Sequence, residues 1–108
     1  MTPTKKIRGG ALLARALQEK GVEHVFTLSG GFCNPALEGF MECQMKVINC
    51  PHEQVAGHFA DGHTRITRKP AVCLVGPEGF ANAVPAMMEA WGERSPVIFV
   101  TGSSTLKR

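Results

Sequence analysis

The chain has 108 residues, of which 44% are hydrophobic and 19% charged, and its twelve Lys and Arg against nine Asp and Glu give a net charge of +3. This length and composition predict a single globular domain and exclude two. No apolar run approaches the roughly 20 residues of a membrane span, and residues 1–10 lack the apolar core of a signal peptide. The basic residues form no cluster interleaved with aromatic residues, which argues against a nucleic-acid partner.

Two helix–strand pairs are predicted in the first half of the chain. They are a helix at 10–20, a strand at 25–28 that runs into a turn at 29–31, a helix that starts at 34–35, and a strand at 46–50. Gly21 is a favourable residue for ending the first helix. Asn34 and Pro35 suit the N-cap and the first position of the second helix. Its predicted apolar face consists of Leu37, Phe40, Met41 and Met45.

Two further helix–strand pairs are predicted in the second half. They are a helix at 53–67 opened by Pro51, a strand at 71–75, a helix at 79–91 and a strand at 97–100. The helix at 53–67 has a predicted apolar face of Val55, Phe59, Gly62 and Ile66. Gly57 and Gly62 lower its helix propensity, which indicates close packing against a neighbour. We expect Met87 and Met88 in the core, with a contact surface near Trp91 as the alternative.

This alternation predicts an α/β fold, a three-layer sandwich around a mostly parallel open sheet. The second, third and fourth strands lack strict alternation of apolar and polar residues, which is typical of strands covered on both faces. The sequence ends soon after the fourth strand, so we expect an exposed apolar flank and an edge strand. The predicted organisation is therefore one partial domain over residues 1–108.

The cysteines predict a reducing compartment, and no metal site is expected. No C-x-x-C pair occurs among Cys33, Cys43, Cys50 and Cys73, so we expect four reduced thiols. The cytoplasm is favoured, with the mitochondrion or peroxisome as alternatives. His52-Glu53 begins like the zinc motif H-E-x-x-H, but Ala56 stands where the second His belongs.

The carboxyl ends of the predicted strands are the place to look for a ligand site, because open α/β sheets bind ligands there. Glu53 follows the second strand, in the first turn of a helix. Spacing alone somewhat favours a glutamate that stabilises the helix N-terminus. The alternative is a partly desolvated carboxyl group that shares a proton with a ligand nitrogen. Ser29-Gly30-Gly31 is either a tight turn, which is the favoured interpretation, or an anion-binding backbone nest.

Residues 52–70, HEQVAGHFADGHTRITRKP, resemble the signature H-E-Q-x-A-x-x-x-A-[DE]-G-Y-A-R-x-T-G-K-P of thiamine-diphosphate-dependent enzymes. The resemblance is narrower to the group of acetolactate synthase, oxalyl-CoA decarboxylase and 2-hydroxyacyl-CoA lyase. Further motifs follow in register: V-F-G-x-P-G-G at 25–31, the end of G-P-G-x-x-N at 79–82, and S-x-P-V-I-x-I-T-G at 95–102. Several motifs in the right order, spanning nearly the whole chain, make the resemblance specific.

The resemblance implies an N-terminal pyrimidine-binding domain. It implies that Glu53 hydrogen-bonds a ring nitrogen of the cofactor's aminopyrimidine and promotes the imino tautomer, which takes a proton from the thiazolium carbon. Asn82 matches the family's asparagine at the start of the helix after the third strand. Leu28 and Val75 match positions that border the pyrimidine. The implied reaction makes or breaks a carbon–carbon bond next to a carbonyl, as in 2-oxo acid decarboxylases, lyases and carboligases.

Departures from the family pattern shape the expected role. The chain has no G-D-G motif, so we expect the domain that binds Mg²⁺ and the diphosphate to be absent, and no turnover by this chain alone. In the family the complete site forms between two subunits, which implies a homo-oligomer or a partner subunit with a diphosphate domain. Glu78 replaces a proline of the family motif. One alternative is a non-catalytic interaction module that dimerises with a full-length relative. Another is a doubly wound domain with no thiamine role.

Overall fold

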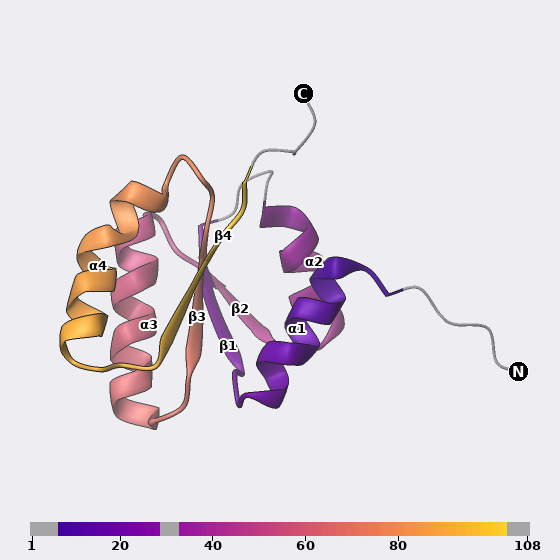
Figure 1. Ribbon diagram of the computed structural model, residues 1–108, viewed down its shortest axis with the longest axis horizontal. Coiled ribbons are helices and arrows are strands. Elements are labelled where there is room, and N and C mark those ends of the chain that lie inside the picture. Colours follow the sequence, from indigo (N-terminus) through magenta and orange to yellow (C-terminus); the bar gives the residue numbers. More distant parts are fainter. Residues whose placement is uncertain (1–6, 29–32, 104–108) are drawn as a thin grey trace, which may run out of the picture.

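The computed structural model describes residues 7–28 and 33–103, which form a parallel sheet with helices on both faces (Figure 1). In chain order the elements are α1 (Gly9–Glu19), β1 (His24–Thr27), α2 (Asn34–Glu42), β2 (Lys46–Asn49), α3 (Glu53–Thr67), β3 (Ala71–Val75), α4 (Phe80–Gly92) and β4 (Val97–Thr101). Helices α1 and α2 cover one face, and α3 and α4 the other (Figure 1). The predicted three-layer α/β fold is confirmed.

The strand order is β2-β1-β3-β4, and every pairing is parallel. The two inner strands are joined by a side chain as well as by their backbones, since the buried Thr27 hydroxyl donates a hydrogen bond of 2.7 Å to the Leu74 carbonyl. Strand β3 is buried along its whole length, whereas β4 is half-exposed and β2 is mostly exposed. Coverage of both faces was therefore a wrong expectation for β2, which lies at an edge of this sheet. Strand β4 packs against the cores on both faces, but only in part.

A separate hydrophobic core lies on each side of the sheet, because neighbouring strand residues point to opposite faces. Val25, Val72 and Leu74 join the core beneath α1 and α2, where Leu17 and Phe40 are the large helix residues. Phe26, Cys73 and Val75 join the core beneath α3 and α4. The buried helix residues of that second cluster are alanines, Ala56, Ala60 and Ala83, and Val55 and Phe80 pack against it while only partly buried. Helices α3 and α4 therefore pack closely on the sheet.

The buried face of α3 differs from the predicted one. It consists of Ala56, Gly57, Ala60, Asp61 and Thr64. Phe59 and Ile66, predicted to be core residues, are 55% and 85% exposed. A Cβ atom on Gly57 would lie only 2.5 Å from the Ala86 Cβ of α4, whereas one on Gly62 would meet nothing within 4 Å. Close packing is thus confirmed for Gly57 and was wrong for Gly62.

The predicted start of α2 and the predicted burial of α4 also need correction. Cys33 is the N-cap of α2, and Asn34 is already its first helical residue. Met88 is 61% exposed and not a core residue, and only Met87 is partly buried. The predicted turn at 29–31 lies outside the described residues.

The four cysteines are all free, as predicted. Burial raises the pKa of the Cys33 and Cys50 thiols, and it raises the pKa of Cys73 to about 12. A raised pKa lowers the fraction of thiolate, which is the reactive form of cysteine, so these three side chains are unreactive core residues. None of the helices in the described part of the chain is long and apolar enough to cross a membrane.

Candidate functional site

Glu53 is the first residue of α3, immediately beyond the carboxyl end of β2. The preceding residue, His52, has the extended backbone conformation of an N-cap, with φ −157° and ψ 150°. Its imidazole Nδ1 accepts a hydrogen bond of 3.0 Å from the Gln54 backbone N–H. The cap therefore ends the β2–α3 connection at His52 and makes Glu53 the first residue of the helix.

The Glu53 carboxylate is held at the start of α4. Its side chain is only 15% exposed, and its Oε1 atom accepts a hydrogen bond of 3.2 Å from Nδ2 of Asn82. The His52 Nε2 atom lies 4.0 Å from the same oxygen. The N-terminus of α3 also favours a negative charge at this position. Two residues that lie 29 positions apart in the sequence thus meet in one polar cluster.

The connection between β3 and α4 is a tight turn. The Gly79 backbone N–H donates a hydrogen bond of 3.2 Å to the Gly76 carbonyl. The Gly79 carbonyl in turn accepts a hydrogen bond of 3.0 Å from the Asn82 backbone N–H. This turn places both Gly79 and Asn82 beside Glu53. These two hydrogen bonds join backbone groups only, and Glu78, in the same turn, is exposed.

The other two predicted site residues occupy the ends of the inner strands. Leu28 follows β1 and is half-buried. Val75 is the last residue of β3, is fully buried and belongs to the core beneath α3 and α4. The structure therefore brings Glu53 and Asn82 into direct contact, and it places Val75 as a packing residue beneath the turn. Ser29, Gly30 and Gly31, the predicted anion nest or turn, lie outside the described residues.

Two residues of this cluster were not singled out as site residues by the sequence. His52 was considered as a metal ligand and as the first residue of the 52–70 signature, and Gly79 as part of a motif. Within residues 7–28 and 33–103, no group of three or more His, Cys, Asp or Glu side chains could hold a metal ion. The sequence signal that could have identified Gly79 is its position, between a fully buried strand and a helix.

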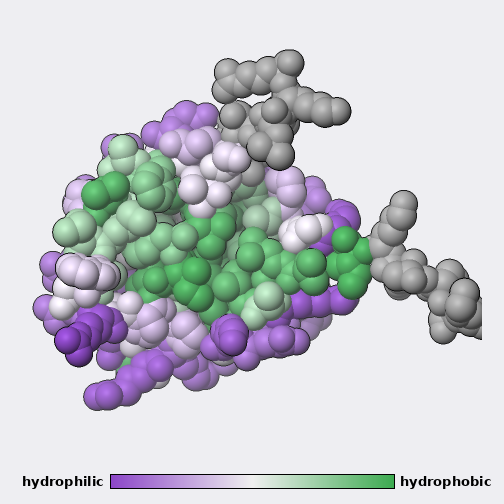
Figure 2. Space-filling model, in the orientation of Figure 1, coloured by the Kyte–Doolittle hydropathy of each residue, from purple (hydrophilic) through white to green (hydrophobic). Residues whose placement is uncertain are grey.

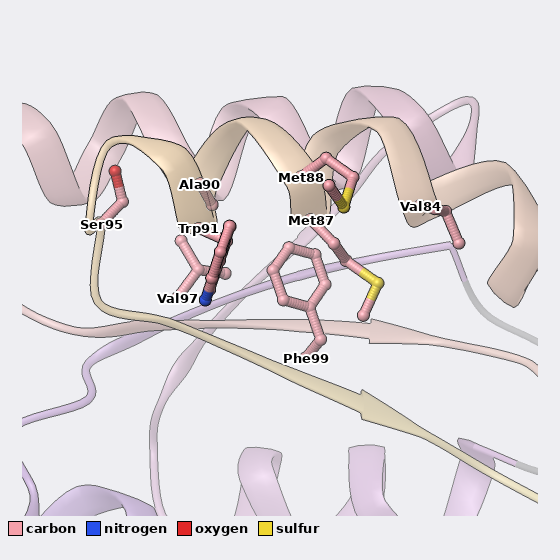
Figure 3. A pocket seen from close by; sticks show the side chains of 8 residues that line it. All are labelled: Val84, Met87, Met88, Ala90, Trp91, Ser95, Val97 and Phe99. Atoms are coloured by element: carbon pink, nitrogen blue, oxygen red, sulfur yellow. The ribbon is translucent and has the colours of Figure 1, made fainter.

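A separate apolar groove runs between α4 and β4. It encloses about 370 Å³. Val97 and Phe99 of β4 point toward Met87 and Trp91 of α4 (Figure 3). Hydrophobic side chains gather over the same face of the molecule, along β4 and beside α4 (Figure 2). Neither Glu53 nor Asn82 lines this groove, so it is distinct from the polar cluster.

Comparison with known proteins identifies the family. Residues 7–108 match the family described as "Thiamine pyrophosphate enzyme, N-terminal TPP binding domain". Acetolactate synthase large subunit IlvG of Mycobacterium tuberculosis is 35% identical over 107 residues, which cover 98% of this chain and 20% of that protein. Probable 2-ketoarginine decarboxylase AruI of Pseudomonas aeruginosa is 33% identical over 103 residues, which cover 94% of this chain and 18% of that protein. The chain therefore spans about a fifth of the length of these relatives.

A solved structure shares the fold. It comes from a Mycobacterium smegmatis protein assigned as a thiamin diphosphate-dependent enzyme, and it superimposes with a TM-score of 0.81 at 25% identity. The alignment covers 91% of this chain and 19% of that one. The sequence resemblance is thereby confirmed on two independent grounds. Because the match runs from residue 7 to residue 108 and the fold is shared, this chain belongs to the family of N-terminal TPP-binding domains of thiamine pyrophosphate enzymes.

Proposed function

We propose that Glu53 binds the aminopyrimidine end of thiamine diphosphate (thiamine pyrophosphate), with Asn82 beside it. We further propose that the chain is the pyrimidine-binding part of an enzyme that makes or breaks a carbon–carbon bond next to a carbonyl. The observation that carries the proposal is the Glu53 carboxylate, 15% exposed at the carboxyl ends of a parallel sheet and hydrogen-bonded to Asn82. Membership of the TPP-binding family supplies the ligand class.

The chemistry of the cluster fits an aminopyrimidine. A carboxyl group can accept a hydrogen bond from a ring N–H when ionised and donate one when protonated. Asn82 occupies one of the roughly four lone-pair sites of the Glu53 carboxylate, which leaves acceptor capacity for a ligand. The small exposed fraction of Glu53 means that a ring nitrogen bound there would meet a carboxyl group with little competing water.

Each residue of the cluster has a definable task. Glu53 would hold a proton or exchange one with the ring nitrogen. Asn82 orients the Glu53 carboxylate by donating to Oε1. His52 fixes the first turn of α3 through its Nδ1. When bound, thiamine diphosphate supplies an electron sink for the carbon–carbon bond chemistry. We propose that Mg²⁺ and the diphosphate are bound elsewhere, because the sequence has no G-D-G motif.

The test is binding of the isolated pyrimidine end. The ¹⁵N-labelled 108-residue chain would be titrated with 4-amino-5-hydroxymethyl-2-methylpyrimidine and followed by heteronuclear NMR. We expect shifts at the start of α3 and in the β3–α4 turn. Glu53→Gln should weaken binding about 10- to 100-fold, because a charge-assisted hydrogen bond is worth roughly 1.5–3 kcal/mol.

Glu78→Gln is the matched control for that titration, since Glu78 is an exposed carboxylate in the neighbouring turn. Its affinity for the aminopyrimidine should equal that of the unsubstituted chain. Equal affinity in the Glu53→Gln variant would contradict the assignment of Glu53. Shifts confined to other elements would contradict the location of the site.

The apolar groove supports a second candidate function, a module that docks on a full-length relative. Trp91 is 79% exposed and Met88 is 61% exposed, and both belong to α4 beside the half-exposed β4. Exposed apolar surface of this kind is typical of interaction sites. Sedimentation velocity of the fluorescently labelled chain, mixed with an acetolactate synthase large subunit, would detect the complex. A labelled chain that sediments at its own rate would count against this function.

A further inference from the structure

Because Gly79 has no side chain, the Glu53 side chain can occupy the space beside it. A Cβ atom built on Gly79 would collide with Oε2 of Glu53 and would lie 2.5 Å from its Cδ and 2.7 Å from its Cγ. Real Cβ atoms do not approach other atoms so closely. The three nearest atoms all belong to Glu53, so the glycine is matched to this one side chain.

The backbone conformation of Gly79 does not itself require glycine. Its φ of −90° and ψ of −6° are accessible to any L-amino acid. Its position is fixed by the turn, through the hydrogen bonds to Gly76 and from Asn82. The missing side chain is therefore explained by the carboxylate that packs against it and not by the path of the chain.

We infer that Gly79 and Asn82 are positioning residues that together hold the Glu53 carboxylate, each acting on a different carboxylate oxygen. Gly79 provides the space for Oε2, and Asn82 donates a hydrogen bond to Oε1. Both residues belong to one hydrogen-bonded turn, so the carboxylate is located relative to α4 as well as to α3. The catalytic relevance of this arrangement rests on the proposed function of Glu53, whereas the arrangement itself does not.

The side chain of Glu53, and not the fold, should give way when Gly79 is replaced. Two of the three atoms in collision, Oε2 and Cδ, form the carboxylate end of a flexible side chain, which can rotate away at the cost of its hydrogen bond to Asn82. Alanine is a poorer N-cap residue than glycine, at a cost on the order of 1 kcal/mol, which is small beside the typical stability of a folded domain. Gly79→Ala should therefore preserve the folded chain and separate Glu53 from Asn82.

Gly76→Ala is the matched control in the same turn. A Cβ atom on Gly76 would have only Glu78 Oε2 nearby, at 3.4 Å, which is an ordinary contact with an exposed side chain. It adds the same methyl group to the same loop and leaves Glu53 undisturbed. Any effect that both variants share would reflect the loop and not the carboxylate.

The first measurement uses no ligand. In the unsubstituted 108-residue chain, NMR should show a nuclear Overhauser effect between Gly79 Hα and Glu53 Hγ, and a side-chain amide resonance of Asn82 displaced by its hydrogen bond. In Gly79→Ala we expect this Asn82 displacement to be lost. Gly76→Ala should retain both signals. An unchanged Asn82 resonance in Gly79→Ala would overturn the inference.

The second measurement is the affinity for the same aminopyrimidine. We expect Gly79→Ala to weaken binding at least 10-fold although the chain remains folded, and Gly76→Ala to bind normally. If the Asn82 signal is lost but not even the unsubstituted chain binds the aminopyrimidine, the positioning stands and the proposed function of Glu53 fails. If Gly79→Ala loses the Asn82 signal yet binds normally, the role of Gly79 in the site is refuted.

A double variant covers the case in which Gly79→Ala does not fold. Glu53→Ala combined with Gly79→Ala removes the three atoms nearest to the new Cβ, namely Oε2, Cδ and Cγ of Glu53. Recovery of the folded spectrum in the double variant would show that the collision with Glu53 is the cause. A double variant that stays unfolded would overturn the inference, because some other contact would then require the glycine.

Discussion

At the scale of single residues, Asp61 on α3 is a buried charged residue outside the candidate site. It is only 4% exposed, and the guanidinium of Arg65 contacts both of its oxygens, at 3.0 Å and 2.8 Å. Arg65 also donates a hydrogen bond of 3.2 Å to Glu89 of α4. Burial by itself would raise the pKa of Asp61, but the hydrogen bonds and charge of Arg65 outweigh it and leave this pKa below its ordinary value.

Asp61→Asn should lower the free energy of unfolding at neutral pH by about 2 kcal/mol, the worth of hydrogen bonds to a charged group. We take the lower part of the range because Arg65 is 42% exposed and therefore partly screened. A depressed carboxyl pKa stabilises the fold above its unfolded value of about 3.8 and ceases to do so as pH falls through the folded value. Urea denaturation should show the deficit of Asp61→Asn shrinking in acid. A deficit that is constant with pH would contradict this account.

His24 provides a second pH-dependent contribution. Burial, followed by the charge of His63, lowers its pKa from the ordinary 6.5, and its ring lies 4.3 Å from that of His63. The unfolded chain therefore binds a proton at His24 more readily than the folded chain does. Stability should be fully present above pH 6.5 and should decrease as pH falls from there through the folded pKa.

His24→Phe should flatten the decline of unfolding free energy between about pH 7 and 5, the range in which histidine titrates. Phenylalanine keeps the ring contacts with His63 and Phe26 and removes the titrating group. The quantity to compare is the slope of unfolding free energy against pH in this variant and in the unsubstituted chain. Thermal or urea denaturation across this range measures it. An unchanged slope in His24→Phe would assign the dependence to another group.

At the scale of elements, α1 and α2 cross so closely that only glycines fit at the contact. A Cβ on Gly39 would collide with the Gly10 carbonyl and would lie 2.6 Å from the Ala11 backbone nitrogen. These obstacles are backbone atoms, which cannot rotate away as the Glu53 side chain can. Gly39→Ala should therefore cost about 3 kcal/mol or more, at the upper end of the overpacking range.

Gly62→Ala is the opposite case within a helix. A Cβ atom at this position would have no neighbour within 4 Å, and Gly62 is inside α3. Alanine there should stabilise the chain by roughly 0.5–1 kcal/mol, because it restricts the unfolded chain and favours the helix. Urea denaturation of both variants would test the pair. Equal effects of the two substitutions would show that helix propensity, and not the crossing, governs these sites.

The elements themselves were largely predictable, because glycine and proline mark their ends and the apolar strands stand out between them. The span of α3 from Glu53 to Thr67 and the span of β3 from Ala71 to Val75 agree with prediction. The buried face of α3 was not predictable from hydrophobicity, since a close helix contact selects Ala and Gly over Phe and Ile. Likewise the sequence predicted Glu53 and Asn82 as site residues, but not that one would hold the other. Their contact depends on the turn at Gly79, whose geometry is a property of the folded chain.

At the scale of the whole molecule, the apolar surface along α4 and β4 should promote association between chains. Trp91 is the only tryptophan of the sequence and is 79% exposed, and the β4 edge has no partner among the described strands. Met88→Lys combined with Trp91→Lys should weaken concentration-dependent association at least 10-fold, because a large apolar side chain contributes about 1.5–3 kcal/mol when buried. Sedimentation velocity would measure this. Lys20→Met, at an exposed position of the opposite layer, should not reduce association.

The interior position of β1 has a consequence for synthesis on the ribosome. Thr27 of β1 donates its buried hydrogen bond to Leu74 of β3, which lies 47 residues later in the chain. At a synthesis rate of about 5–20 residues per second, Leu74 is added roughly 2–9 s after Thr27. Within that interval β2, which begins at Lys46, is the one strand of this sheet that becomes available to pair with β1, and the opposite edge of β1 remains open. The nascent chain is therefore most exposed to misassembly before β3 emerges.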